Sequence, residues 1–262
     1  MKKILKYFSI MIMVLLLSVG CGKKEDPQKI LDEVTANMQS VESVSVKITF
    51  KIVMDVEGAN FSMDMIMDMD TDKDQDIHGT ASVNMFGIKE EVEMYAVTRD
   101  GYEYSYMKTP EIDEWQYTKA EITTNEEEQQ LKDEMNKMFD SMSNVKEVKS
   151  DRDGYTKLEV TVDMKQFSEL LKEYGVDETL PEINQDSDMV MNLYVKDGYV
   201  YILEIDYAEM FKAFKGEEDS EEFFNSLSEA KLTIEYSNFN KVDDIVVPEE
   251  IVNNAKVAVG EE

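Results

Sequence analysis

The chain contains one imidazole, His78, and one thiol, Cys21, so few catalytic pairs are available to it. A Ser-His or Cys-His pair needs the imidazole within hydrogen-bonding reach of the nucleophile, and only His78 can supply it. The sequence has no Gly-x-Ser-x-Gly motif, no His-Glu-x-x-His motif and no phosphate-binding loop. Carboxylates are so numerous that no pair stands out for glycosidase chemistry. We therefore predict that the protein is not an enzyme and that His78 is an exposed strand histidine.

Methionines at alternate positions form a possible copper site. Met63, Met65, Met67 and Met69 share one face of a strand if this stretch is extended, and thioethers bind Cu(I). The same spacing is required of a buried strand face, and flexible methionine side chains fill irregular cores and pockets. We favour the core or pocket interpretation.

Aspartates also alternate, at positions 68, 70, 72, 74 and 76. An EF-hand needs a glycine after the third acidic residue and a glutamate eleven residues after the first ligand, and both are missing here. We interpret this run as a solvated hairpin end, and we predict neither a metal nor a cofactor.

Cys21 has a different chemistry from a catalytic thiol. Residues 1–20 comprise a basic start, an apolar run from Tyr7 to Leu17 and short side chains, which is typical of a signal peptide and too short for a stable membrane span. A cysteine directly after this segment resembles a bacterial lipobox, although Ser18 replaces the usual leucine. In a lipobox the cysteine sulfur is diacylated and the cysteine becomes the new N-terminus. The alternative is an ordinary secretory peptide followed by an incidental free thiol.

The anchor would be followed by a short tether. Residues 21–25 precede Asp26-Pro27, a typical N-cap and first helical residue, and five residues span at most about 17 Å. We therefore expect the folded domain to lie against the extracytoplasmic face of the bacterial cell membrane.

Composition limits the class of protein further. The 262 residues include 57 acidic and 27 basic side chains, for a formal net charge of -30, which excludes a nucleic-acid binder because phosphates need a basic surface. With 42% hydrophobic residues the chain can build a sizeable core. No linker rich in Pro, Gly or Ser divides it, so we predict a single domain over residues 26–262.

The elements that position these residues are mainly strands. Apolar residues alternate with polar ones from Val44 to Val56, and the methionine stretch after a turn at Gly58-Ala59-Asn60 pairs most simply with this strand. Asp-Gly-Tyr occurs at 100–102, 153–155 and 197–199, and Asp-Gly favours type I′ hairpin turns, so the sheet is mainly antiparallel. Further strands are expected at 77–86, 88–98, 102–107, 115–119, 189–196, 199–207 and 231–239.

Helices are expected at the start and in the middle of the chain. The first runs from about Pro27 to Gln39, with Leu31, Val34 and Met38 on one stripe. Apolar spacing predicts two more at 125–142 and 163–174, and shorter ones near 210–214 and 221–227. An aromatic group, made up of Tyr102, Tyr104, Tyr106, Trp115 and Tyr117, is interpreted as cross-strand packing, with the rim of an amphipathic ligand site as the alternative.

The order of lipobox, short tether, helix, long antiparallel strands, inserted helices and a terminal Val-Pro-Glu-Glu at 247–250 resembles a known group. It is similar to the half-barrel lipoproteins of the LolA and LppX type, especially those of unknown function from Gram-positive bacteria. The resemblance implies an α+β fold in which a strongly bent antiparallel sheet holds helices on its concave side around an apolar cavity. Soluble LolA-type carriers lack the anchor expected at Cys21.

On this resemblance we expect a lipoprotein that binds or transfers a lipid or another apolar ligand at the membrane. The alternative is a structural or regulatory protein with a filled core that acts on an envelope partner. The expected pocket combines sheet and helix residues: Phe50, Ile52, Met54, Met65, Met67, Met135, Met138, Phe139, Phe167 and Leu171.

Overall fold

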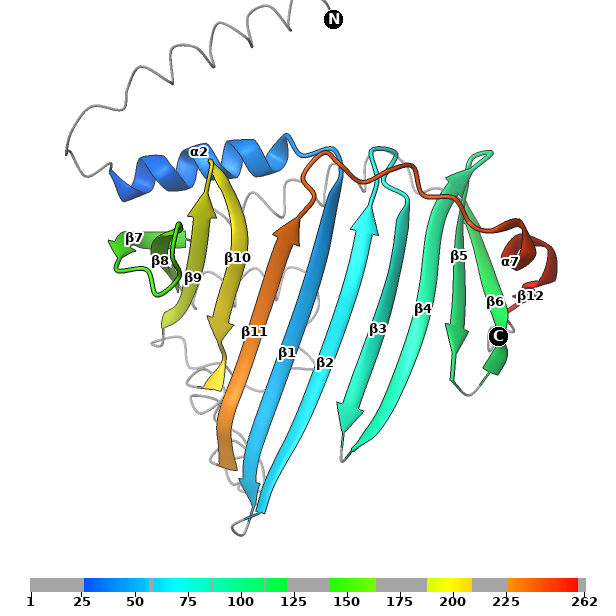
Figure 1. Cartoon of the computed structure of the whole chain (residues 1–262), viewed down its shortest axis with the longest axis horizontal. Helices are drawn as coiled ribbons and strands as arrows, with labels where there is room; N and C mark the ends of the chain where they lie inside the picture. Colours follow the sequence, from blue (N-terminus) through cyan, green and yellow to red (C-terminus); the bar gives the residue numbers. More distant parts are fainter. Residues whose placement is uncertain are drawn as a thin grey trace, which may run out of the picture.

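The computed structural model describes residues 26–56, 59–85, 87–110, 112–121, 142–163, 188–208 and 226–258. In these ranges one sheet contains the strands in the order β12-β6-β5-β4-β3-β2-β1-β11-β10-β9-β8-β7 (Figure 1). The strands are β1 (Val44–Val56), β2 (Ala59–Thr71), β3 (Ile77–Met85), β4 (Ile88–Arg99), β5 (Tyr102–Thr109), β6 (Ile112–Glu121), β7 (Met142–Val148), β8 (Thr156–Asp163), β9 (Asp188–Lys196), β10 (Tyr199–Asp206), β11 (Leu227–Ser237) and β12 (Lys256–Val257). The helices are α2 (Pro27–Gln39) and α7 (Glu249–Asn254), and neither has the length and hydropathy that crossing a membrane requires.

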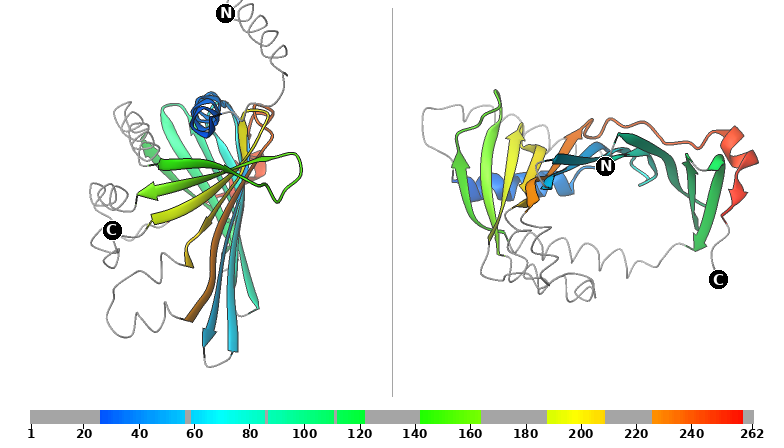
Figure 2. Two further views of the ribbon diagram at one scale, coloured as in Figure 1. Left: turned by 90° about the vertical axis from the view of Figure 1, so that its left-hand side faces the viewer. Right: turned by 90° about the horizontal axis from the view of Figure 1, so that it is seen from below.

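The sheet is curved and open. Its ladders are antiparallel except for the short parallel pairing of β12 with β6, as the hairpin signals predicted. Seen from below, the strands follow an arc from β7 to β6 that does not close (Figure 2). The predicted bent antiparallel sheet is confirmed, and the two described helices place the fold in the α+β class.

Register gives this sheet two different faces. β1 pairs with β2 along its whole length, so that Phe50 lies opposite Met65 and Lys47 lies opposite Asp68. On the other side of β1, Phe50 lies opposite Leu232 and Lys47 opposite Glu235. Because alternate residues point to opposite faces, apolar side chains gather on one face and charged ones on the other.

Helix α2 begins and packs as the sequence predicts. The Asp26 side chain accepts a hydrogen bond from the Gln28 backbone N–H, and Pro27 occupies the first turn. Leu31 and Val34 are buried in a cluster with apolar residues of β8, β9 and β10. The apolar face is therefore covered by α2 at this end of the sheet.

A second apolar cluster lies on the opposite face of the sheet. Tyr95 and Tyr106, which are register partners on β4 and β5, pack with Val97 and with Val247 and Ile251 of the C-terminal segment. This segment, residues 238–258, runs from the end of β11 to the edge of β6 (Figure 1). Sequence patterns did not predict α7 or β12.

Two of the three Asp-Gly-Tyr turns follow the prediction. Asp100 and Gly101 both have positive φ, and so do Asp197 and Gly198, as a type I′ turn requires. At the third, Gly154 alone has positive φ and the loop between β7 and β8 spans 149–155. The type I′ prediction is wrong there because the loop is too long for a two-residue turn.

Several predicted boundaries differ in the structure. Ala59 and Asn60 belong to β2, since they pair with Val56 and Asp55. Met142 begins β7 and Leu227 begins β11, although both were assigned to helices. The remainder of the helices predicted at 125–142, 163–174, 210–214 and 221–227 falls outside the described residues, apart from Asp163, the last residue of β8, and Ser226, which directly precedes β11.

The two edges of the sheet are irregular or short. In β7, register shifts between Ser143 and Lys146, and Asn144 has a φ of 49°. At the other edge β12 contains only Lys256 and Val257.

Candidate functional site

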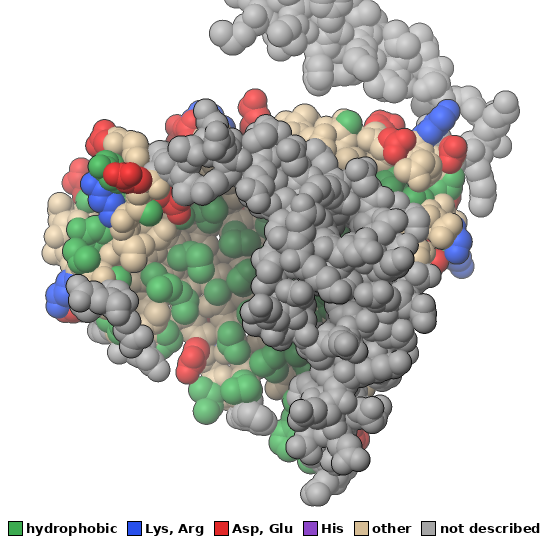
Figure 3. All heavy atoms as spheres, turned by 180° about the vertical axis from the view of Figure 1, so that it is seen from behind, with side chains coloured by type: hydrophobic (Ala, Val, Ile, Leu, Met, Phe, Trp, Pro, Cys, Tyr) green, Lys and Arg blue, Asp and Glu red, His purple; other side chains and the backbone are tan. Residues whose placement is uncertain are grey.

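The apolar face forms a continuous surface across the middle of the sheet. Its rows follow from the ladders: Val160, Met191, Ile205, Leu232, Phe50, Met65 and Val83 are successive register partners from β8 to β3. Figure 3 shows hydrophobic side chains gathered over the hollow of the sheet. The four methionines of β2 all belong to this face, since Met63, Met65, Met67 and Met69 pair with Ile52, Phe50, Ile48 and Val46.

Part of this face is open to solvent. At the β8 and β9 end Leu158 and Val160 are fully buried. At the β3 to β5 end Val83 is 37% exposed, Met85 45%, Ile88 67% and Met107 47%. Large apolar side chains that remain exposed on one face mark an interaction or ligand-binding surface more often than a core.

The structure brings together the sheet half of the predicted pocket. Phe50, Ile52 and Met54 lie on β1 beside Met65 and Met67 of β2, and all five are partly buried on the apolar face. The predicted helix half, made up of Met135, Met138, Phe139, Phe167 and Leu171, lies outside the described residues. The expected cavity between the two halves thus stays a prediction.

The predicted aromatic group is cross-strand packing on the opposite face. Tyr104, Tyr106 and Tyr117 contact one another with ring centroids 5.8 to 6.5 Å apart, and Trp115 lies 5.7 Å from Tyr95. Lys119 Nζ lies 3.6 Å from the ring centroid of Tyr102 and 5.3 Å from that of Tyr104. Apart from Tyr102, this group belongs to the second apolar cluster.

His78 lies on β3 in a more enclosed place than predicted. Its ring stacks on Tyr95 at 4.3 Å, and its Nε2 is 3.3 Å from a carboxylate oxygen of Glu93. Burial, with the charge of Glu93, raises the pKa of the Tyr95 hydroxyl. The His78 side chain is only 35% exposed, because its neighbours on β4 cover one side of the ring. The histidine is therefore less exposed than the sequence analysis predicted.

Beside His78 the polar face is hollowed by a groove of about 500 Å³. Its lining includes Ser45, Lys47, Asp68, Asp70, Thr80, Tyr155, Tyr201, Glu235 and Ser237. Sequence analysis did not single out this set. The only local signal is that most of these residues alternate with the apolar positions of β1, β2, β3 and β11.

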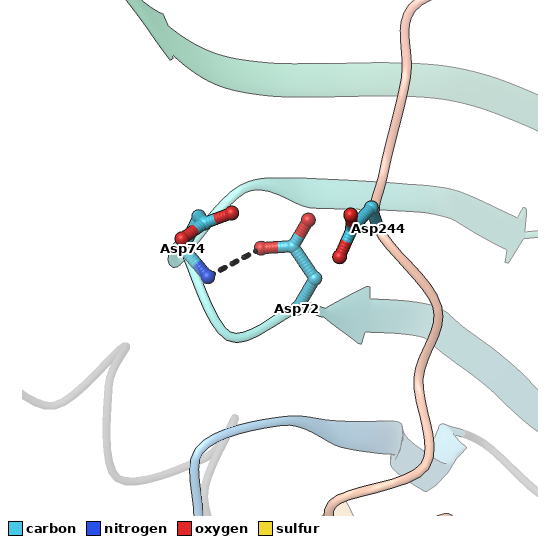
Figure 4. A group of neighbouring side chains, drawn as sticks. All are labelled: Asp72, Asp74 and Asp244. Atoms are coloured by element: carbon cyan, nitrogen blue, oxygen red, sulfur yellow. Dashed lines mark hydrogen bonds between the residues drawn. The ribbon is translucent and has the colours of Figure 1, made fainter.

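The alternating aspartates end in a compact acidic cluster. Asp72, Asp74 and Asp244 have carboxylate oxygens within 4.8 Å of one another (Figure 4). Asp72 is 1% exposed and accepts hydrogen bonds from the backbone N–H groups of Asp74, Asp76 and Ile245. The prediction of a solvated hairpin end is wrong for Asp72, because its carboxylate satisfies buried backbone donors.

Lys73 forms ion pairs with the other two carboxylates, Asp74 and Asp244. Lys73 Nζ lies 2.9 Å from Asp74 Oδ2 and 2.6 Å from Asp244 Oδ1. The ammonium group therefore offsets part of the charge of these two carboxylates, and the hydrogen bonds of Asp72 are those of a turn that fixes the C-terminal segment.

An open, curved sheet with one apolar face and one grooved polar face thus defines the class of this protein. The model of a family of unknown function, DUF6612, matches residues 26–256, and the chain belongs to that family. A search of curated proteins gave no match.

Solved structures similar to this chain include two mycobacterial proteins. The lipoprotein LppX of Mycobacterium tuberculosis is 12% identical with a TM-score of 0.45, and LprF of Mycobacterium bovis is 14% identical with a TM-score of 0.43. Each alignment covers 85% of this chain, together with 100% of the LppX chain and 96% of the LprF chain. LppX is a protein of the type that the sequence resemblance named.

Proposed function

We propose that the protein is a membrane-anchored extracytoplasmic lipoprotein that binds or transfers a lipid or another apolar molecule on the concave face of its sheet. One observation carries the proposal: the apolar face continues across the middle of the sheet and stays partly exposed from β3 to β5. Apolar ligand sites are lined mainly by hydrophobic side chains, and methionines repack around ligands of different shape. In this proposal the helices predicted at 125–142 and 163–174 lie across the concave face and enclose the ligand.

Two matched valines test whether the apolar face binds such molecules. Val83 on β3 and Val190 on β9 are 37% and 40% exposed, but they belong to opposite faces, because Val83 pairs with Met65 and Val190 with Thr161. With protein that begins at Gly22, we expect V83Q to weaken binding of the uncharged fluorophore N-phenyl-1-naphthylamine by up to about tenfold, since burying a valine contributes about 1.5 kcal/mol. Titration by fluorescence measures both affinities.

The control V190Q should leave the affinity unchanged. Absence of probe binding by the unmodified protein, together with no apolar molecule found by mass spectrometry of purified material, would reject a binding function. That result would favour the structural or regulatory alternative, in which the chain's own side chains fill the concavity.

The anchor is tested separately at Cys21. Two acyl chains hold a protein stably to a bilayer, whereas one chain gives only marginal attachment. We expect the unmodified protein in the membrane fraction of expressing cells and C21A in the soluble fraction or retained as uncleaved precursor. Equal recovery of mature C21A and unmodified protein with the membrane would contradict the proposal.

A further inference from the structure

The groove on the polar face has two walls of different composition. On one side Tyr155, at the end of the loop between β7 and β8, contacts Tyr201 of β10 with centroids 6.0 Å apart and planes at 70°. That loop projects beyond the middle strands (Figure 2, left). On the other side lie His78 and Thr80 of β3. The volume of about 500 Å³ is within the range of small-molecule sites, roughly 300 to 1,000 Å³.

Carboxylates dominate the charge of this groove. Asp68, Asp70 and Glu235 line it, and Lys47 is the single lysine or arginine among the described lining residues. Lys47 lies between Asp68 and Glu235 in one cross-strand row, with its Nζ 4.0 Å from Asp68 Oδ1. Asp70 accepts a hydrogen bond from the Ser45 hydroxyl. Glu235 makes no ion pair with any residue that the structure describes, so the row keeps an excess of negative charge.

The tyrosine wall is suited to a cation. A ring face carries negative electrostatic potential and attracts ammonium groups. Tyr155 already makes such a contact with an ammonium group from outside the groove, since Lys196 Nζ lies 5.9 Å from its ring centroid. Aromatic rings beside unpaired carboxylates recognise an ammonium group and the hydrocarbon chain next to it.

We propose that this groove binds a small soluble organic cation, an aliphatic diamine or a similar polyamine. Three carboxylates against one lysine leave two negative charges, which two ammonium groups balance, while the methylene chain contacts Tyr155 and Tyr201. The site is independent of the apolar ligand proposed above, because its charged lining side chains point to the opposite face of the sheet.

His78, the sole histidine of the chain, lines this groove and provides an NMR signal for ligand binding there. Its ring protons are observed without competing histidine signals. We expect 1,6-diaminohexane to shift these signals saturably in the full chain in a non-ionic detergent, at about 150 mM salt to screen the net charge. The uncharged analogue 1,6-hexanediol should not shift them.

Matched double variants separate the groove from the general acidity of the protein. D68N/E235Q removes one acid from β2 and one from β11 within the groove, and we expect the diamine affinity to fall about tenfold or more. D64N/E229Q removes one acid from each of the same strands and the same face outside the groove, and should change the affinity less than about twofold. If the double variant does not fold, as judged by circular dichroism, the single variants D68N and E235Q should each weaken binding about threefold.

Two results would overturn the proposal. One is that the His78 signals do not respond to the diamine. The other is an equal loss of affinity in the two double variants, which would assign the binding to the overall charge of the chain. Loss of apolar probe binding in V83Q, with diamine binding intact, would show that the two sites are separate.

Discussion

At the scale of single residues, Glu204 is the most enclosed carboxylate after Asp72 among the residues that the structure describes. It is 8% exposed on β10, and its oxygens lie 2.7 Å from Arg152, 3.1 Å from Lys231 and 3.1 Å from the hydroxyl of the fully buried Tyr194. Burial raises the pKa of Glu204, but the hydrogen bond and charge of Lys231, with Tyr194 and Arg152, outweigh it and leave the pKa below its ordinary value. The folded protein therefore favours the ionised form.

This lowered pKa predicts a pH-dependent contribution to stability. The contribution of Glu204 is complete above the ordinary pKa of 4.5 and is lost as the pH falls through the lower folded value. We expect E204Q to lower the free energy of unfolding by about 1 to 3 kcal/mol at neutral pH and by less in acid. Urea denaturation over a pH series measures both.

The control for Glu204 is a more exposed pair on the same face. Glu229 lies 2.7 Å from Lys51, and both side chains are roughly two-fifths exposed, at 38% and 42%. E229Q should cost less than about 1 kcal/mol, because solvent screens such pairs. A cost for E204Q that equals that of E229Q, or that does not change with pH, would contradict the argument.

At the scale of elements, the C-terminal segment is tied to the sheet at successive points. Asn240 donates its backbone N–H to the Ser43 carbonyl, Val242 donates to the Ser43 hydroxyl and Ile245 donates to Asp72 Oδ2. Val247 and Ile251 are then buried among the tyrosines. Asp72 connects this segment to the turn between β2 and β3, since its other oxygen accepts from Asp74 and Asp76.

Replacing Asp72 by asparagine tests this connection. An amide has one accepting oxygen, so D72N can keep either the turn or the bond to Ile245, and a buried donor loses its partner. We expect a loss of about 1 to 3 kcal/mol, with faster amide hydrogen exchange at Ile245 if the turn is kept. D74N removes the same charge from an exposed, lysine-paired position and should cost less than about 1 kcal/mol. Equal effects of the two variants would show that Asp72 is not a structural connection.

Asp72 and the groove show which features of the structure the sequence alone predicts and which it does not. The alternation in β1 and β2 is local, so both strands, their pairing and the face shared by the apolar residues of β1 and the methionines of β2 were predictable. The role of Asp72 depends on Ile245, 173 positions away, and the groove depends on the pairing of β11 with β1. Neither contact leaves a local pattern, and an alternating run of aspartates has the same composition whether solvated or buried.

At the scale of the whole molecule, the two faces of the curved sheet carry different kinds of side chain. The concave face presents hydrophobic side chains (Figure 3). The opposite face presents the carboxylates and tyrosines of the groove. The protein has a formal net charge of -30, so it repels a soluble anionic ligand at a distance and attracts a cation. Under the two proposals above, this charge favours uncharged or zwitterionic lipids for the concave face and amines for the groove.

The shape of the two sheet edges has a consequence for how copies of the protein meet at high concentration. An open sheet with regular edges offers rows of unpaired backbone groups to which a neighbour's strand can add, and repetition of that step builds a fibre. Here the backbone of β7 departs from regular pairing around Asn144, and β12 extends the opposite edge by only two residues. Strand addition is poorly templated along β7, although β12 pairs only with Gln116 and Tyr117 of β6. A fibre needs two competent edges, so repeated strand addition is disfavoured in this protein despite its exposed apolar face.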